Sequence, residues 1–466
     1  MKKRSIRIAA VPVALALVAG ACGSDDGGDA SGSETEGTSA ASEGTAAEGT
    51  TAEGGSAMTS GDFEGAEVTI TGPERDDPSV IAIQDTLAAF GEENNISISY
   101  TGDADWEANI NTQVEGGNPP DISIFPQPGK LADFANAGSV VALSDEVVST
   151  VEEFWDEGYR VYGNVDGTQY GVPVKTDLKS LVWYKPAAFE ENGYELPETI
   201  DDLTALMEQM VSDGNTPLCV GIESGQATGW PFTDWTEEMV LRQSGGDVYD
   251  QWVSHEIPFD DPQIVEAMQA VVDFWAPENV FASGGSIAAT NFGDNATPLV
   301  DGQCMMHRQA SFFAGFFPEG TTFADESDPD TIDTFYFPDI NGDQPVLTAG
   351  TLAAAFNEDP ATMAVLNYMA TADYAETRQR LQTEALDGGL SGFLSAAKGQ
   401  DESVYQPLEQ GFLEILASSE LARFDASDLM PADVGAGTFW SEGTSLVNGD
   451  ETAEQAAANI EASWPS

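Results

Sequence analysis

The sequence predicts an α/β fold built around a mostly parallel sheet. Short segments that alternate apolar and polar residues, as half-buried strands do, are followed by longer segments with apolar residues at helical spacing. Gly and Pro separate the segments. The strand–helix–strand order calls for crossover helices, which join parallel strands. A chain of 466 residues with 41% hydrophobic residues can fill cores for two or three domains.

The pattern is clearest near the start of this region. EVTIT at residues 67–71 alternates like a strand, and residues 79–90 place Val80, Ile83 and Leu87 on one face of a helix. Further strands are predicted at residues 96–100, 121–125, 170–173, 179–184, 216–222 and 346–355. Further helices are predicted at residues 106–114, 130–137, 201–211, 233–242, 262–275, 359–370, 375–381 and 451–462.

The charge balance excludes some partners. The chain has 16 Lys and Arg against 80 Asp and Glu, a formal charge of −64. A nucleic-acid partner is not expected, because too few cations are present to neutralise phosphates. Residues 63–466 hold 71 of the acids, so the acidity belongs to the globular body. It predicts a protein adapted to saline surroundings, where screening weakens self-repulsion.

The N-terminus predicts export. Residues 1–21 combine four cations with an apolar run too short to span a bilayer, which is typical of a signal peptide. Cys22 follows at a position that resembles a bacterial lipobox, although Ala19 stands where that motif usually has a larger aliphatic residue. We therefore expect a lipid anchor on Cys22, with an ordinary secreted protein as the alternative. Residues 22–61 lack aromatic residues and predict a disordered acidic linker.

The remaining cysteines form an even pair. With Cys22 lipidated, Cys219 and Cys304 are left in an oxidising compartment, which favours a disulfide between them. Two buried free thiols are the alternative.

Enzyme motifs give no positive signal. The sequence has no G-x-S-x-G, P-loop or H-E-x-x-H motif, and only His255 and His307 are present. We therefore predict no catalytic residues, no metal and no cofactor. A glycosidase with two carboxylates stays open, because counting acids cannot test their separation.

Several stretches resemble extracellular solute-binding proteins of ABC importers. The similarity is greatest to the carbohydrate-binding group that includes alpha-glucoside-binding lipoproteins, and it covers nearly the whole chain from Val68 to Trp464. The stretches are NPPDISIFPQPGKLADFANAGSVVAL (118–143), YGVPVKTDLKSLVWYK (170–185), CVGIESGQATGWPFTDWTEEMVLR (219–242), VYDQWVSHEIPFDDP (248–262) and CMMHRQASFFAGFFPEG (304–320).

The resemblance implies a two-lobed fold, each lobe a mixed sheet flanked by helices, with a ligand cleft at a hinge. It places one lobe at residues 62–175 and 346–385 and the other at 176–345 and 386–466. It implies a monomer that binds a sugar, closes, and delivers the sugar to permease subunits. The lipid anchor would be its only membrane contact.

Aromatic residues are the first candidates for sugar binding, because their rings stack on the apolar faces of pyranoses. Trp230 and Trp235 lie in Gly- and Thr-rich surroundings, and Trp440 follows the flexible stretch GAGT. The family pattern also matches a cleft aromatic at Phe125. Ordinary core packing is the alternative for each of these four residues.

Polar candidates follow strand ends or the inter-lobe loop, where side chains can bind hydroxyls in pairs. They are Asp177, Gln127, Arg75, Asp76, Glu223, Arg308 and His307. A salt bridge or other structural role is the alternative for each. The stretch AGTL departs from the family pattern, because relatives often have Asp where Thr351 stands.

Two other functions remain open. The same fold could bind a cationic or other solute, such as a polyamine or peptide, although cations near the predicted cleft fit this less well. A secreted glycoside hydrolase is the third possibility. A sugar binder of an ABC importer is the function that the sequence favours.

Overall fold

The computed structural model describes residues 63–465 apart from 341 and 343. The predicted signal peptide (1–21), the lipid-anchor residue Cys22 and the predicted linker (22–61) lie outside the described residues. In the described part of the chain, no helix combines the length and the apolar character that crossing a membrane requires.

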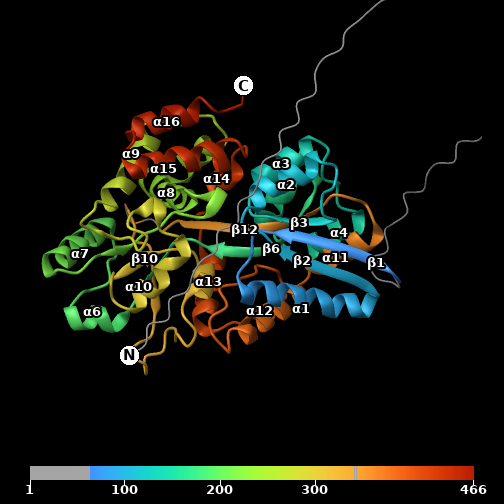
Figure 1. Cartoon of the computed structure of the whole chain (residues 1–466), viewed down its shortest axis with the longest axis horizontal. Coiled ribbons are helices and arrows are strands. Elements are labelled where there is room, and N and C mark those ends of the chain that lie inside the picture. The colour runs from blue at the N-terminus through green and yellow to red at the C-terminus, as the bar shows by residue number, and fades with distance from the viewer. Residues whose placement is uncertain (1–62, 341, 343, 466) are drawn as a thin grey trace, which may run out of the picture. The chain divides into compact units, whose positions relative to one another are not determined.

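Within the described residues, six strands form a first mixed sheet (Figure 1). The central order is β13-β12-β3-β1-β2, and β6 pairs with β12. The strands are β1 (Ala66–Gly72), β2 (Ile96–Gly102), β3 (Ile122–Phe125), β6 (Gly171–Leu178), β12 (Val346–Ala355) and β13 (Ala422–Phe424). A separate hairpin joins β4 (Asn164–Val165) to β5 (Thr168–Gln169).

The burial of these strands follows their position in the sheet. In β1, Val68 and Ile70 are buried while Glu67 and Thr69 are exposed, so the alternation in EVTIT reflects one buried face. All four residues of β3 are buried, as expected for a strand covered on both faces. Parallel pairing of β1 with β2 and β3 brings the carboxyl ends of all three strands to one edge.

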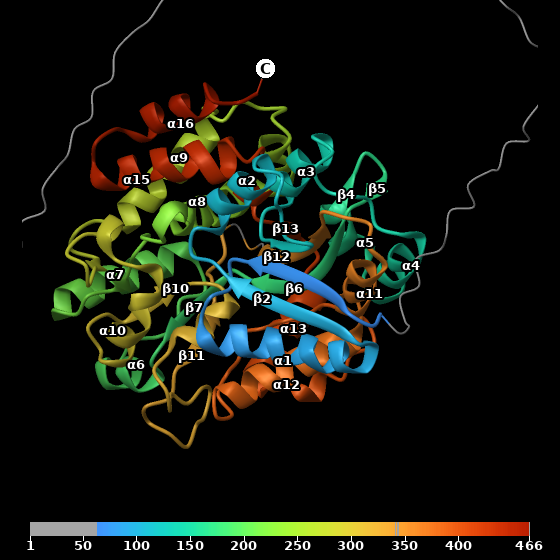
Figure 2. The ribbon, with the colours of Figure 1, turned by 45° about the vertical axis from the view of Figure 1, so that its right-hand side comes forward.

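Helices cover this sheet on both faces. Helix α1 begins after Asp76, whose side chain accepts a hydrogen bond from the amide of Ser79 at 3.0 Å. It packs on β2 and on α12, and both views show α1 and α12 lying side by side (Figures 1 and 2). The helices of this part are α1 (Asp77–Asn94), α2 (Trp106–Glu115), α3 (Pro128–Asn136), α4 (Asp145–Phe154), α5 (Glu157–Arg160), α11 (Pro360–Met369) and α12 (Ala372–Ala385).

A second mixed sheet of five strands has the order β11-β7-β10-β8-β9 in the described chain. Its strands are β7 (Leu181–Tyr184), β8 (Leu218–Cys219), β9 (Val280–Phe281), β10 (Met306–Arg308) and β11 (Asp333–Tyr336). The other helices are α6 (Pro186–Asn192), α7 (Ile200–Asp213), α8 (Trp230–Val253), α9 (Pro262–Phe274), α10 (Ala296–Val300), α13 (Pro407–Ser418), α14 (Ala426–Leu429), α15 (Trp440–Asn448) and α16 (Ala453–Glu461).

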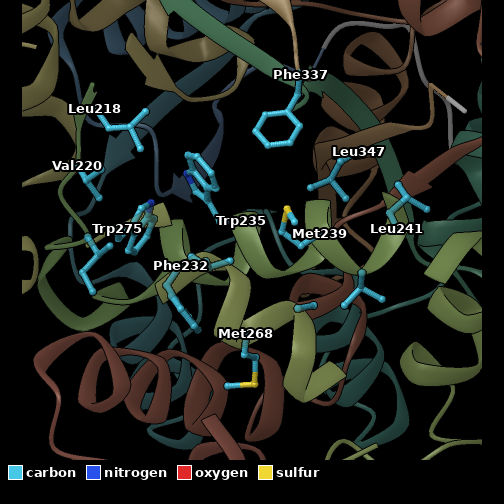
Figure 3. Close-up of a cluster of buried hydrophobic side chains, with 14 of the residues drawn as sticks. Leu218, Val220, Phe232, Trp235, Met239, Leu241, Met268, Trp275, Phe337 and Leu347 are labelled. Atoms are coloured by element: carbon cyan, nitrogen blue, oxygen red, sulfur yellow. The ribbon is translucent and has the colours of Figure 1, made fainter. Parts of the chain in front are cut away.

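A large apolar core supports the second sheet. Trp235 projects from α8 and meets Trp275 and Phe337 at ring-centre distances of 5.7 and 5.6 Å (Figure 3). Such edge-on aromatic pairs add to the energy of burial alone. Cys219 on β8 and Cys304 form the predicted disulfide, with Cα atoms 5.4 Å apart, and it links segments that are 85 residues apart in the chain.

The structure corrects three expectations about these elements. In the first sheet three of the five strand pairs are parallel and β12 runs antiparallel to β3 and β6, whereas the second sheet is not mostly parallel, because β7 runs antiparallel to both β10 and β11. The strand predicted at residues 216–222 is only β8, since backbone pairing with β9 ends after two residues. Helix α8 begins at Trp230, before the predicted start, because Pro231 fits the first turn of a helix.

Candidate ligand-binding site

A cavity of about 440 Å³ lies between elements of the two sheets. Two walls enclose it. The first-sheet wall comprises Pro73, Glu74, Arg75, Asp76, Ser79, Ala104, Glu107, Pro126, Gln127, Lys175, Asp177, Ala349, Gly350, Thr351, Gln382, Ser391 and Gly392. The second-sheet wall comprises Lys179, Ser224, Ala227, Trp230, Asp234, Asn291, Phe292, Phe312, Gly315, Phe316 and Trp440. Asp425, the N-cap of α14, and Ser427 and Asp428 within that helix complete the lining.

Glu74 is the charged centre of the first-sheet wall. It follows β1, where the carboxyl ends of the parallel strands meet, which is the usual ligand edge of such sheets. Its Oε1 accepts a hydrogen bond of 2.6 Å from Arg378 and lies 3.6 Å from the Lys175 ammonium. Burial raises the pKa of Glu74, but the charges of Arg378 and Lys175 lower it by more than burial raises it. The pKa of Glu74 therefore lies below its ordinary value. Glu74 is therefore ionised.

Strand β6 carries two further charges into the cavity. The Lys175 ammonium lies 3.3 Å from Asp177 and 5.3 Å from the ring centre of Phe312. Burial raises the pKa of Asp177, and the Lys175 charge opposes that shift. This strand therefore contributes an ion pair whose cation also faces an aromatic ring of the opposite wall.

Lys179 is the buried cation beneath the cavity. Its ammonium lies 2.7 Å from Asp234 and also pairs with Asp425. Burial opposes its charge, but these two acids raise its pKa well above the ordinary value. Carboxylate oxygens of Asp234, Glu237 and Asp425 lie within 4.8 Å of one another, a spacing that could hold a metal ion. The ammonium of Lys179 already pairs with two of these acids, Asp234 and Asp425.

The second-sheet wall provides the aromatic surface. Trp230 meets Phe292 at 4.9 Å and Phe312 at 6.0 Å between ring centres. Gly229 has φ of +115°, and a Cβ at this position would overlap the main chain of Trp440. Glycine is therefore required for the segment before α8 to pack against α15, which brings Trp230 and Trp440 to the same cavity.

Six of the sequence-predicted residues line this cavity: Trp230, Trp440, Asp177, Gln127, Arg75 and Asp76. These residues differ in the interactions that they make within the protein. Asp76 caps α1, whereas Arg75 is exposed and forms no ion pair within 4.0 Å in the described part of the chain. Asp177 is paired with Lys175.

Phe125 and Trp235 lie in cores and do not line the cavity. Phe125 packs edge-on against Trp106 at 5.2 Å. Trp235 follows Trp230 by five residues on α8, and at about 100° per residue the two side chains leave the helix in different directions. Trp235 therefore enters the core of the second sheet (Figure 3). Trp230 lines the cavity instead.

The three polar residues outside the lining have structural partners. His307 lies in β10, where its Nδ1 is 2.9 Å from the carbonyl oxygen of Cys219. Arg308 pairs with Glu238 at 2.6 Å. Glu223 lies beside the cavity and accepts hydrogen bonds from the side chain of Asn291 and the amide of Gly225, which lower its pKa.

The sequence reasoning missed Glu74, Lys179, Gln382 and the phenylalanines of the second-sheet wall. The stretch SFFAGFF did carry a signal, because Phe312 and Phe316 are four residues apart beside a glycine. Gln382 had no such signal, since it lies in the last turn of α12 and reaches the cavity through the packing of α12 on α1.

Comparisons with known proteins agree with this architecture. Residues 76–376 match the bacterial extracellular solute-binding protein family. The chain is 37% identical to the alpha-glucosides-binding periplasmic protein AglE of Rhizobium meliloti (strain 1021), covering 87% of this chain and 88% of the relative. It is 36% identical to the osmoprotective compounds-binding protein GgtB of Synechocystis sp. (strain ATCC 27184 / PCC 6803 / Kazusa), covering 87% and 94%.

Solved structures share the fold. The bacterial solute receptor AcbH, described with a preference for b-D-galactopyranose, aligns with a TM-score of 0.71 at 19% identity, covering 85% of this chain and 98% of that one. RafE in complex with raffinose aligns with a TM-score of 0.65 at 17% identity, covering 86% and 98%. Together with the relatives, these matches identify the chain as a member of the bacterial extracellular solute-binding protein family, whose proteins act outside the cytoplasm as non-enzymatic transporter components.

Proposed function

We propose that this protein binds a sugar, an alpha-glucoside or another oligosaccharide, in the cavity and delivers it to the permease of an ABC importer. One observation carries the proposal. The aromatic second-sheet wall faces a first-sheet wall of carboxylates and amides. Pyranoses need both surfaces, because their C–H faces stack on rings while their hydroxyls bind polar groups. The alpha-glucosides-binding and osmoprotective compounds-binding relatives support a small polyhydroxylated solute.

We propose that Trp230 and Trp440 stack on the sugar, while Asp177, Gln127, Arg75 and Asp76 meet its hydroxyls. Glu74, Thr351 and Gln382 join this set, although the sequence had not singled them out for binding. Phe125, Trp235, His307, Arg308 and Glu223 support the site from outside the lining.

We propose that two lobes close over the sugar, one at residues 62–175 and 346–385 and the other at 176–345 and 386–466. The five strands of the second sheet all come from the second range, which supports this division. Residues of β6 and β12 lie at the transition, where the chain passes between the two sheets. Strand β13 pairs with β12, so the last range also contributes to the first sheet.

We propose that the protein is a monomer held at the outer face of the cell membrane by a lipid on Cys22. The lipobox-like position of Cys22 supports this anchor. Mass spectrometry of the mature N-terminus should find a diacylated cysteine, and Cys22→Ala should release the protein into the medium. An unmodified N-terminus at another residue would contradict the anchor.

Calorimetric titration of the purified protein with mono-, di- and trisaccharides tests the sugar proposal. We expect at least one neutral α-glucoside to bind, and to raise the melting temperature because it binds only the native state. Intact folding with no response to the whole panel would contradict the proposal. Hydrolysis of a chromogenic glycoside would instead indicate an enzyme.

A further inference from the structure

The fixed charges of the cavity are paired within the protein. Glu74 pairs with Arg378 and Lys175, Asp177 pairs with the same Lys175, and Asp234 and Asp425 share the single ammonium of Lys179. Burial raises the pKa of Asp234 to about 7 and also raises the pKa of the half-buried Glu107 and Asp428, which favours the neutral form of these acids. A ligand therefore meets a cavity with little uncompensated charge in its interior. Arg75 and Asp76 form no ion pair in the described part of the chain, but Arg75 is exposed and Asp76 only half-buried, and solvent weakens their attraction for a charged ligand.

Two of the five aromatic rings of the described lining, those of Phe312 and Trp230, already have a cation over the ring. The Lys175 ammonium lies 5.3 Å from the ring centre of Phe312, and the Lys179 ammonium lies 5.8 Å from that of Trp230. A cationic ligand on either ring would lie close to a lysine of the same sign. The rings are therefore poor sites for an ammonium group, although aromatic faces in general attract cations.

Several lining residues have a buried polar atom without a hydrogen-bond partner in the described part of the protein. The atoms are Glu74 Oε2, Gln127 Oε1, Gln382 Oε1, Thr351 Oγ1 and Trp440 Nε1. The first three can only accept hydrogen bonds, and the orientation of the Gln382 amide is fixed because its Nε2 donates to the carbonyl of Ser391 at 3.0 Å. Unpartnered buried acceptors are rare in folded proteins, and a ligand that contacts these residues can supply the missing donors.

We infer that the cavity selects an uncharged, donor-rich ligand and rejects sugars that carry either a carboxylate or an ammonium group on the buried ring. This inference rests on the proposed function and narrows it to neutral glycosides. Hydroxyls of the ligand donate to Glu74, Gln127 and Gln382, and Trp440 donates to a ligand oxygen. A carboxylate cannot donate to the unpartnered acceptors, and an ammonium group meets Lys175 and Lys179.

The test compares methyl α-glucoside and maltose, each with its 6-carboxylate and its 6-ammonium analogue, by calorimetry with the full protein. We expect each charged analogue to bind at least about tenfold more weakly than the neutral parent. Leaving a buried acceptor without a hydrogen bond reduces affinity by about this factor. A carboxylate or ammonium analogue that binds as tightly as its parent overturns the inference. If neither neutral parent binds, the comparison is repeated with the neutral sugar that binds best in the panel, and the proposed function fails, with the inference, only if no sugar of the panel binds.

Variants assign the selection to particular side chains. Glu74→Gln keeps the shape of the side chain but removes its charge. We expect the affinity for the neutral sugar to fall about tenfold, and the ratio of this affinity to that for the carboxylate analogue to decrease. Glu67→Gln, at an exposed position of β1, is the matched control and should change neither value. Thr351→Val is a second variant. The Thr351 hydroxyl has no hydrogen-bond partner in the described part of the protein, so its removal breaks no internal hydrogen bond, and we expect the affinity for the neutral sugar to fall. Unchanged affinity in both variants overturns the assignment.

Discussion

The two walls of the cavity differ in their chemistry and in what supports them. The first-sheet wall presents carboxylates and amides, and its central carboxylate, Glu74, pairs with a buried arginine from α12 and with Lys175. The second-sheet wall contains all five aromatic side chains of the described lining and rests on a large apolar core. The difference suggests that damage to the first wall affects folding as much as binding. Loss of a ring from the second wall should mainly affect binding.

The largest expected effect is on the first-sheet wall. Arg378→Met removes the guanidinium that pairs with Glu74 and leaves a buried carboxylate with only Lys175 as a partner. We expect the free energy of unfolding to fall by about 3–5 kcal/mol, measured by urea denaturation.

Arg380→Met is the matched control on the same helix. Arg380 pairs with Glu384, and both side chains are more than half exposed, so the expected loss is about 0–1 kcal/mol. Equal losses in the two variants would show that the first-sheet wall does not depend on the buried pair.

The next effect is a loss of affinity on the second-sheet wall. Trp230→Ala removes the half-buried ring at the centre of the aromatic surface, and we expect about thirtyfold weaker binding of a neutral glucoside. Trp464→Ala is the control, because Trp464 stacks on His255 and does not line the cavity. If calorimetry finds that Trp230→Ala binds the glucoside as tightly as the wild type, the aromatic wall does not contribute to sugar binding.

Gly229 tests how the two tryptophans are held together. In Gly229→Ala, the new Cβ would meet the main chain of Trp440, so α15 must shift, and we expect both a stability loss of about 1–3 kcal/mol and weaker sugar binding.

Gly245→Ala is the control that shows the effect of backbone strain without a shift of α15. Gly245, also in α8, has φ of +80°, but a Cβ there would meet no heavy atom within 4 Å. It should lose stability and keep its affinity. The same affinity loss in both variants would argue against the packing role of Gly229.

The smallest effect concerns pH. Burial lowers the pKa of His307, in the second sheet, to about 4, below its ordinary value of 6.5. Between these values the unfolded chain binds a proton that the folded chain does not, so stability falls as the pH falls from 6.5 towards 4. The expected slope from this residue is about 1 kcal/mol per pH unit.

His307→Gln should lack that part of the slope, and subtracting its pH profile from that of wild type cancels the contributions of the acidic residues. Parallel profiles between pH 6.5 and 4 would mean that His307 is protonated in the fold. Glu74, whose pKa is lowered, should stay ionised over most of this range, so the first-sheet wall keeps its charge.

The sequence predicted the elements better than their pairing. Strands at residues 67–71 and 121–125 could be recognised because alternation and continuous burial are local patterns. The antiparallel pairing of β12 with β6 was not visible, because it joins residues at least 170 positions apart, such as Thr348 and Leu178. The true start of α8 depends on Gly229 and Pro231 together, and propensity alone misplaces it.

Residues of the site could be predicted only where the neighbouring sequence indicated their role. Trp230 and Trp235 share one stretch of sequence, yet helical geometry sends one to the cavity and the other to the core. Glu74 acquires its role from Arg378, 304 residues away. No single segment could reveal that pair, and the same holds for the unpartnered oxygen of Gln382.

A crystal structure of the protein grown with a neutral α-glucoside tests the central claim most directly. The account predicts a sugar ring in the cavity, stacked on Trp230 or Trp440, with hydroxyls within hydrogen-bond distance of Glu74 and Gln127. A sugar bound elsewhere, or held in the cavity without contact to either wall tryptophan, would contradict it.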